Sequence, residues 1–184
     1  MQEEAKKRIA TCRKEQRLWL DLSGLNLQEL PAELGELVWL ERLSVSRNQL
    51  DSLDAVKPLV RLHKFACTKN RISSIEALKG MKHMKFLFMG ENEITDLEAL
   101  KNMKGLKKLA AHHNQLSDLL PLASLSSLVY LDLSCNSIED VEPVKSLQSL
   151  LWLSLEGNSL DAQTMNMLEH SLKGLAVYRT TGLR

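Results

Sequence analysis

The chain repeats one pattern of apolar and polar positions at a fixed spacing. In the stretch "LERLSVSRNQL" the first, fourth, sixth and eleventh positions are apolar, and the ninth is asparagine. The same frame returns in "LVYLDLSCNSI", and its asparagine recurs every 22 residues. The asparagines are Asn48, Asn70, Asn92, Asn114, Asn136 and Asn158. Repetition at such a period predicts a stack of similar units, in which each unit packs on its neighbours.

The frame predicts a short strand in each unit. Side chains alternate along a strand, so the fourth and sixth positions point inward, and the third, fifth and seventh point outward. The fourth-position residues are Leu20, Leu43, Phe65, Leu87, Leu109, Leu131 and Leu153. The sixth-position residues are Leu22, Val45, Cys67, Met89, Ala111, Leu133 and Leu155. The rest of each unit is about eleven residues long, which predicts turns or 3₁₀ segments rather than a regular α-helix.

Both ends of such a stack need a cover, because the core would otherwise be exposed. Residues 1–17 have Ala5, Ile9 and Cys12 at helical spacing and predict an amphipathic helix. Residues 161–184 begin with Asp161, a typical N-cap, and contain a strand-like "LAVY". The apolar face of this second helix consists of Met165, Leu168 and Leu172. We therefore expect a single domain over residues 1–184, with seven repeats over 18–160 between two helical caps.

The frame LxxLxLxxNxL resembles the leucine-rich repeat in its 22-residue form, which is found in phosphatase-regulator-like and internalin-like proteins. The resemblance covers roughly residues 18–160, and the first repeat is one residue longer, with Leu25 rather than Asn26 at the asparagine position. It implies an α/β fold: a right-handed, curved solenoid with a parallel β-sheet on its concave face and short 3₁₀ or turn segments on its convex face. It also implies a structural role for the asparagines.

Composition and charge exclude several classes of function. The 24 basic and 23 acidic residues give a formal net charge of +1, so no overall charge draws the chain to nucleic acid or a membrane surface. No apolar run is long enough to span a membrane, and the charged start is unlike a secretion signal. Three cysteines, an odd number, argue against a disulfide framework, and Cys12 and Cys67 are expected to be buried. We expect a cytoplasmic monomer without a cofactor.

The outward positions of the strands concentrate aromatic and basic residues, the types that anchor protein interfaces. Basic residues prevail in repeats two to five, and aromatic and acidic residues in repeats six and seven. The partner is expected to be a protein that presents an acidic surface to repeats two to five and inserts an apolar element near Tyr130 and Trp152. The predicted partner-binding residues of the concave face are Arg42, Lys64, Phe86, Phe88, Lys108, His112, Tyr130, Asp132 and Trp152.

A structural role for the same aromatic residues is the alternative, since cross-strand pairs stabilise sheets. Trp19 beside Arg42 is the clearest candidate, because arginine packs well on an indole ring. Phe88 has only small residues beside it, which predicts a ring that projects freely toward a partner. A second, smaller contact patch is possible at Leu120, where an apolar residue replaces the acid found in other repeats.

A different class of function is suggested by the eighth position of the frame. Glu91, His113 and Cys135 occupy it in three consecutive repeats, and His112 precedes His113. Neighbouring strands lie about 4.8 Å apart, so this spacing permits a metal site or a cysteine-dependent activity. The position lies where the strand gives way to a loop, however, which is a poor place to lower the pKa of a thiol. The sequence favours a non-enzymatic adaptor, scaffold or regulatory subunit; a recognition domain cut from a larger signalling protein is the other alternative.

Overall fold

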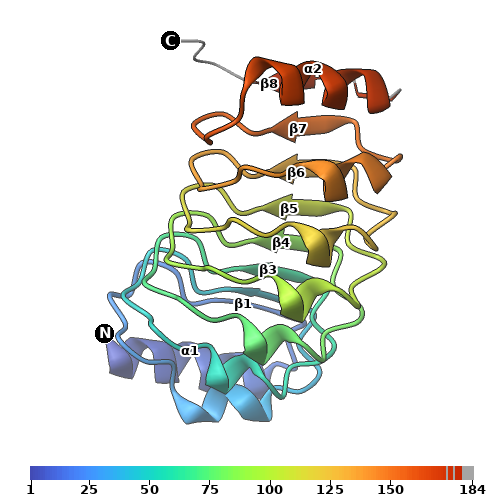
Figure 1. The fold of residues 1–184 in the computed structure, drawn as a ribbon. Helices are drawn as coiled ribbons and strands as arrows, with labels where there is room; N and C mark the ends of the chain where they lie inside the picture. The colour runs from blue at the N-terminus through green and yellow to red at the C-terminus, as the bar shows by residue number, and fades with distance from the viewer. Residues whose placement is uncertain (173, 176, 180–184) are drawn as a thin grey trace.

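The computed structural model describes residues 1–172, 174–175 and 177–179, and its central feature is one open parallel sheet (Figure 1). Eight strands lie in it in sequence order, each paired with the next. They are β1 (Trp19–Asp21), β2 (Arg42–Ser44), β3 (Lys64–Ala66), β4 (Phe86–Phe88), β5 (Lys108–Ala110), β6 (Tyr130–Asp132), β7 (Trp152–Ser154) and β8 (Val177–Arg179). Equivalent residues of successive repeats are paired, as in Leu20 with Leu43. The register therefore follows the 22-residue frame.

Short 3₁₀ helices form the opposite wall of the solenoid (Figure 1). They are η1 (Ala32–Glu36), η2 (Asp54–Val56), η3 (Glu76–Leu78), η4 (Glu98–Leu100), η5 (Leu120–Leu122) and η6 (Glu142–Ser146). Several begin with the same turn, in which a serine or aspartate accepts a hydrogen bond from the backbone N–H two residues later; Asp118 and Leu120 are one example, at 2.8 Å. The predicted leucine-rich-repeat architecture is confirmed.

The core is the space between the sheet and the 3₁₀ wall, and the two inward columns of the strands fill it. All fourteen residues of the fourth and sixth positions are buried, including Phe65 and Cys67, which are fully inaccessible. The predicted burial of Cys12 and Cys67 is confirmed, and burial raises the pKa of the Cys67 thiol to about 12. Among the outward positions, Ala110 and Ser154 are buried as well, since larger neighbours cover them.

The repeated asparagines bond neighbouring coils together. The amide nitrogen of Asn92 donates to the carbonyl of Met89 in its own coil, at 3.1 Å, and to that of Cys67 in the preceding coil, at 3.0 Å. Its side-chain oxygen accepts a hydrogen bond from the N–H of Ile72 at 3.1 Å. Asn48 bonds in the same way to Leu27, which agrees with Leu25 at the asparagine position of the first repeat. Each amide thus satisfies backbone groups that the loop would leave unpaired.

Helices cover the two ends of the stack (Figure 1). The helix α1 (Gln2–Lys14) buries Ala5, Ile9 and Cys12, the face predicted from their spacing. The helix α2 (Ala162–Ser171) begins at Asp161, whose carboxylate accepts a hydrogen bond from the N–H of Thr164 at 2.7 Å.

Leu168 of α2 and Leu172, the residue that ends the helix, are buried. The side chain of Met165, predicted on the same face as these two residues, lies outside the described residues. The strand β8 pairs with β7, so the strand-like stretch after the helix extends the sheet by one strand. Helical caps at both ends agree with the predicted fold, and the proposed boundaries of the caps and repeats stay a prediction.

Candidate functional site

The concave face consists of the outward side chains of the strands, at the third, fifth and seventh positions of each repeat. The sheet places predicted site residues from neighbouring strands in register: Lys64 beside Phe86, Phe86 beside Lys108, and Tyr130 beside Trp152. Arg42 and Lys64 are exposed, whereas the other predicted residues are half-buried by one another. The predicted residues therefore form one continuous surface that already has internal contacts.

Two aromatic rings near the C-terminal end of this face are stacked. The rings of Tyr130 and Trp152 lie with their centroids 4.1 Å apart and their planes 4° from parallel. On the tyrosine, the ammonium of Lys108 lies 3.7 Å from the ring centroid. Both the stack and the cation–π contact hold side chains in one conformation, and such order lowers the entropy that binding would otherwise cost.

Phe88 lies between two lysines instead of projecting freely. The Lys64 ammonium is 5.8 Å from its ring centroid, and the Lys108 ammonium is 5.6 Å away on the side of the next strand. The expectation that small neighbours would leave this ring clear is wrong, because long side chains from β3 and β5 reach across those neighbours. Sequence spacing gave no signal for this, since Lys64 and Lys108 occupy the third position and Phe88 the fifth. The result is a row that runs Lys64, Phe88, Lys108, Tyr130, Trp152, which we call the cation–aromatic row.

His112 and Asp132 form an ion pair beside this row. The Nδ1 atom of His112 lies 3.5 Å from a carboxylate oxygen of Asp132, at the long limit for a hydrogen bond. No closer partner of this buried nitrogen exists in the described part of the chain. The imidazole lies directly over Gly90, where a β-carbon would be only 2.4 Å from the ring. A glycine at this position of β4's repeat therefore makes the room that the ring occupies.

The pair shifts the pKa of both groups. Interaction with Asp132 raises the pKa of His112 above its ordinary 6.5, although burial opposes the shift. Burial alone would raise the pKa of Asp132, but the histidine and hydrogen bonds from Ser134 outweigh it, so the pKa of this carboxyl is lowered. Ser134 donates to Asp132 through its hydroxyl at 2.7 Å. The two site residues thus neutralise each other at mildly acidic pH, and neither is a free charge for a partner.

The N-terminal end of the face is an open groove of about 600 Å³. Trp19, Arg42, Lys64 and Phe88 line it, together with the acidic residue Asp21 and other residues of β1–β3. Trp19 lies beside Arg42 in register, as predicted. The guanidinium over its indole belongs to Arg17, however, 5.9 Å from the ring centroid. Trp19 remains 49% exposed, so this groove offers apolar area between basic side chains.

The eighth position of each repeat is a backbone corner. Every residue from the second to the sixth repeat has positive φ there, including Glu91 (56°), His113 (51°) and Cys135 (53°), and glycine takes the corner in the first and seventh repeats. Such φ values belong to the left-handed region, which turns the chain out of the strand. Glu91 is bonded to Lys69 of the neighbouring corner at 3.4 Å. The shared register of these three residues is therefore explained by the turn.

In the described part of the chain, no three His, Cys, Asp or Glu side chains come close enough together to hold a metal ion. His112, the fourth member of the suggested cluster, is directed to Asp132 and meets His113 only edge-on, with ring centroids 5.8 Å apart. The geometry thus gives the metal or cysteine alternative no support beyond the spacing that suggested it.

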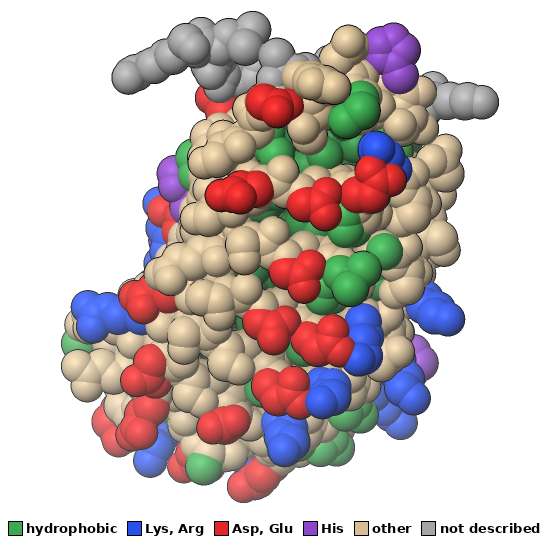
Figure 2. Space-filling view, in the orientation of Figure 1, with side chains coloured by type: hydrophobic (Ala, Val, Ile, Leu, Met, Phe, Trp, Pro, Cys, Tyr) green, Lys and Arg blue, Asp and Glu red, His purple; other side chains and the backbone are tan. Residues whose placement is uncertain are grey.

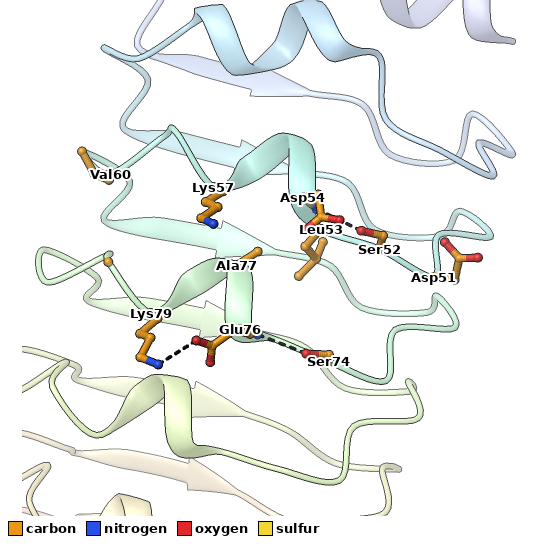
Figure 3. A pocket seen from close by; sticks show the side chains of 11 residues that line it. Asp51, Ser52, Leu53, Asp54, Lys57, Val60, Ser74, Glu76, Ala77 and Lys79 are labelled. Atoms are coloured by element: carbon orange, nitrogen blue, oxygen red, sulfur yellow. Dashed lines mark hydrogen bonds and ion pairs between the residues drawn. The ribbon is translucent and has the colours of Figure 1, made fainter.

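The outer wall has a different charge. Figure 2 shows acidic side chains one above another across the coils. A hollow of about 700 Å³ lies beside η2 and η3, and Figure 3 shows the side chains that line it. Within it, the carboxylate of Glu76 accepts a hydrogen bond from the ammonium of Lys79 at 2.7 Å. The backbone N–H of Glu76 donates to the hydroxyl of Ser74 at 3.3 Å. Lys101 and Lys145 pair with acids three residues earlier in the same manner. These charges compensate one another, as expected of a solvated edge.

Leu120 is 68% exposed on this wall, at the position where η2, η3, η4 and η6 begin with an acidic residue. Among the described helices, none combines the length and the apolar character needed to cross a membrane.

Comparison with known proteins identifies the repeats. A family model described as leucine-rich repeats, in two copies, matches residues 104–146. No curated protein sequence matches significantly.

Solved structures are similar over most of the chain. An internalin of Listeria monocytogenes is 28% identical with a TM-score of 0.78, over 86% of this chain and 48% of its own. A second internalin of that species, internalin C2, is 21% identical with a TM-score of 0.71, over 96% and 90%. The ectodomain of a plant membrane receptor kinase of Arabidopsis thaliana is 23% identical with a TM-score of 0.65, over 82% and 19%.

This chain thus spans about half the length of the first internalin. The repeating frame, the asparagine bonds, the parallel sheet and these similarities agree with one another. The chain has the leucine-rich-repeat fold, matches the leucine-rich-repeat family model over residues 104–146, and is similar in structure to internalins.

Proposed function

We propose that this protein is a non-enzymatic recognition module that binds a partner protein through its concave face, as an adaptor, scaffold or regulatory subunit. The single observation that supports this most is the cation–aromatic row, in which Lys108 contacts Tyr130 and approaches Phe88 while Tyr130 stacks on Trp152. Tyrosine and tryptophan side chains are enriched at the centres of protein interfaces, and the lysines beside them would add charge complementarity to an acidic partner.

The row also defines the chemistry of the partner. Lys64 and Lys108 present ammonium groups beside aromatic faces, and Arg42 is exposed at the end of the groove toward β1. A partner carboxylate would neutralise these cations, while an apolar side chain would pack on the half-buried rings near Trp152. An acidic surface with an apolar anchor is therefore the complementary shape. His112 and Asp132 would act at its margin, since they already neutralise each other.

The structural neighbours support binding of a protein or peptide ligand in general terms. The Arabidopsis receptor ectodomain is described in complex with Casparian strip integrity factor 2. That protein shares the fold with this chain at low identity, so the comparison adds plausibility to the class of function and leaves the partner open.

The remaining expectations on location and assembly stay predictions. A cytoplasmic location rests only on the three free cysteines. The neighbours do not support it, since one of them is a receptor ectodomain. A monomeric state, and the absence of a cofactor, rest on sequence reasoning alone.

The test is affinity capture from the source organism's lysate with the wild type and a Phe88→Ala/Trp152→Ala double variant. Leu120→Ala is the matched control, because it removes an exposed apolar side chain from the opposite wall. Circular dichroism must first show that all three proteins are folded alike. We expect a partner that the wild type and the control retain and the double variant loses. A partner retained equally by all three would contradict the proposal.

A further inference from the structure

The edge at which the chain enters the strands contains a second charged hollow, separate from the concave face. It measures about 440 Å³ and lies between the second, third and fourth repeats. We call it the basic edge groove; its lining residues are Glu41, Arg61, His63, Lys82, His83, Lys85 and Gly105. Figure 2 shows basic and histidine side chains along the edge to the right of the acidic column.

The cations of this groove are not neutralised from within. Arg61, Lys82 and Lys85 are exposed, and none of them forms an ion pair with a described residue. The only acid in the lining, Glu41, is directed to the Nε2 atom of His63 at 3.3 Å. Lysines on the acidic wall behave differently. Several of them form an ion pair with a glutamate three residues earlier, as Lys79 does with Glu76. The groove thus retains an excess of positive charge.

The groove is also open and lies beside the starts of β3 and β4. Gly105 forms part of its lining, and a β-carbon there would have no atom within 4 Å, so the space beside it is free. His63 and Lys85 directly precede the first residues of β3 and β4, and Lys64, which begins β3, belongs to the cation–aromatic row. A ligand chain that leaves the row across the start of β3 therefore enters the groove.

We propose that the basic edge groove binds an acidic polypeptide segment, and that this segment belongs to the same partner that contacts the cation–aromatic row. The second half of this statement rests on the proposed function; the first half does not. Carboxylates spaced along an extended chain would meet cations from two neighbouring repeats, which lie about 5 Å apart at the sheet.

Other anionic partners fit the groove less well. Among the described residues, no phenylalanine, tyrosine or tryptophan lines it, whereas single-stranded nucleic acid is normally held by stacking on such rings. A flat anionic membrane would also approach the acidic column on the adjacent wall, where like charges repel (Figure 2). A narrow acidic chain enters the groove without that contact.

The test uses a fluorescein-labelled peptide of eight glutamates and fluorescence anisotropy at low salt, where screening is weak. We expect the wild type to bind and an Arg61→Glu/Lys85→Glu variant to bind at least about 10-fold more weakly, or about 1.4 kcal/mol. The matched control is Lys57→Glu/Lys79→Glu, which makes the same change of net charge at the acidic wall. It should change affinity less than about 3-fold. Equal losses in both variants would show that only overall charge matters and would overturn the proposal.

Gly105 allows a test that does not reverse a native charge. Because the site has room for a side chain, Gly105→Lys and Gly105→Glu should both fold normally. We expect the lysine variant to bind the peptide more tightly and the glutamate variant more weakly. Identical affinities would contradict a peptide in the groove. A different outcome is a wild type that fails to bind the peptide but binds phosphatidylserine vesicles or a single-stranded oligonucleotide. If that binding were lost in the Arg61→Glu/Lys85→Glu variant, the groove would be a site for that ligand and the proposal would be overturned.

The same assay separates this inference from the proposed function. The Phe88→Ala/Trp152→Ala variant should retain peptide binding, since neither residue lines the groove. If the peptide binds normally and the captured partner binds the Phe88→Ala/Trp152→Ala variant as well as the wild type, only the proposed function is overturned. A captured partner that is lost with the row variant but unchanged by Arg61→Glu/Lys85→Glu would overturn the groove as part of that interface.

Discussion

At the scale of single residues, the corner at the eighth position shows how one backbone requirement accommodates very different side chains. Gly24 and Gly157 occupy it with φ of 68° and 71°, and the corners of the second to sixth repeats have arginine, lysine, glutamate, histidine and cysteine. The left-handed conformation costs a residue with a β-carbon about 1–2 kcal/mol, and the stacked coils offset that cost. Chemistry-bearing residues in one column are therefore no evidence of a shared reaction.

The two corner glycines allow that cost to be measured. A β-carbon at Gly24 would meet no atom within 4 Å, whereas one at Gly157 would lie 3.0 Å from the sulfur of Cys135. We predict that Gly24→Ala lowers the free energy of unfolding by about 1 kcal/mol, from the backbone alone. Gly157→Ala should cost more, because it adds the clash. Chemical denaturation compares them; equal costs would mean that the sulfur yields without penalty.

The His112–Asp132 pair predicts a dependence of stability on pH. The raised pKa of His112 stabilises the fold below about 6.5, its ordinary value, and this contribution is lost as the pH rises through the folded-state pKa. The lowered pKa of Asp132 stabilises the fold above 3.8, and that contribution is lost as the pH falls through its folded-state value. The pair is therefore strongest in the window between these two values.

Replacing one partner should remove this window. We predict that Asp132→Asn lowers the free energy of unfolding by about 0.5–1 kcal/mol near pH 5.5 and by less near pH 8, where the histidine is neutral. Urea unfolding at both pH values measures the difference. A loss that is the same at both pH values would assign the effect of Asp132 to its hydrogen bonds with Ser134 instead.

At the scale of elements, the asparagine is the joint between coils. Asn92 is 9% exposed and bonds to backbone groups of two coils, so its loss leaves several buried groups unpaired. We predict that Asn92→Ala costs about 3 kcal/mol of the free energy of unfolding. Asn158, which is half-buried near the end of the stack, should cost less when replaced in the same way. The opposite ranking in thermal or chemical denaturation would contradict this account of the joint.

The features of the fold that recur in every repeat could be predicted from the sequence, whereas side-chain contacts that occur in a single repeat could not. Period, inward columns and the asparagine register follow from alternation along a strand, and the structure confirms them down to Leu25 in the first repeat. The contacts of Lys108 with Phe88 and Tyr130 could not be predicted, because a long flexible side chain chooses among several neighbours within reach. The position of His112 over Gly90 could have been predicted, because a glycine stands at the same position of the preceding repeat and leaves room for the ring.

At the scale of the whole molecule, the coils contact only their neighbours, so stability is expected to be local. Ile9 of α1 is 2% exposed and covers the first coil. We predict that Ile9→Ala, a loss of about 2–4 kcal/mol, increases amide hydrogen exchange in β1 and β2 while β5 and β6 keep their protection. Equal losses of protection in all strands would show that the solenoid unfolds as one cooperative unit.

Charge is also distributed by face across the molecule. Figure 2 shows the acidic wall with basic side chains along its edge, and the cation–aromatic row lies on the concave face, while the net charge of the chain is only +1. A partner with an acidic, partly apolar surface would be oriented by this arrangement before close contact is made. The central claim is that this contact centres on the row.

The most direct measurement is the dissociation constant of the captured partner for the wild type, Trp152→Ala and Leu120→Ala. Removal of an anchor commonly costs about 2 kcal/mol or more, which is roughly 30-fold in affinity. The account predicts a loss of that size for Trp152→Ala, with Leu120→Ala within about 2-fold of the wild type. Unchanged affinity for Trp152→Ala, or a large loss only for Leu120→Ala, would contradict recognition by the concave face.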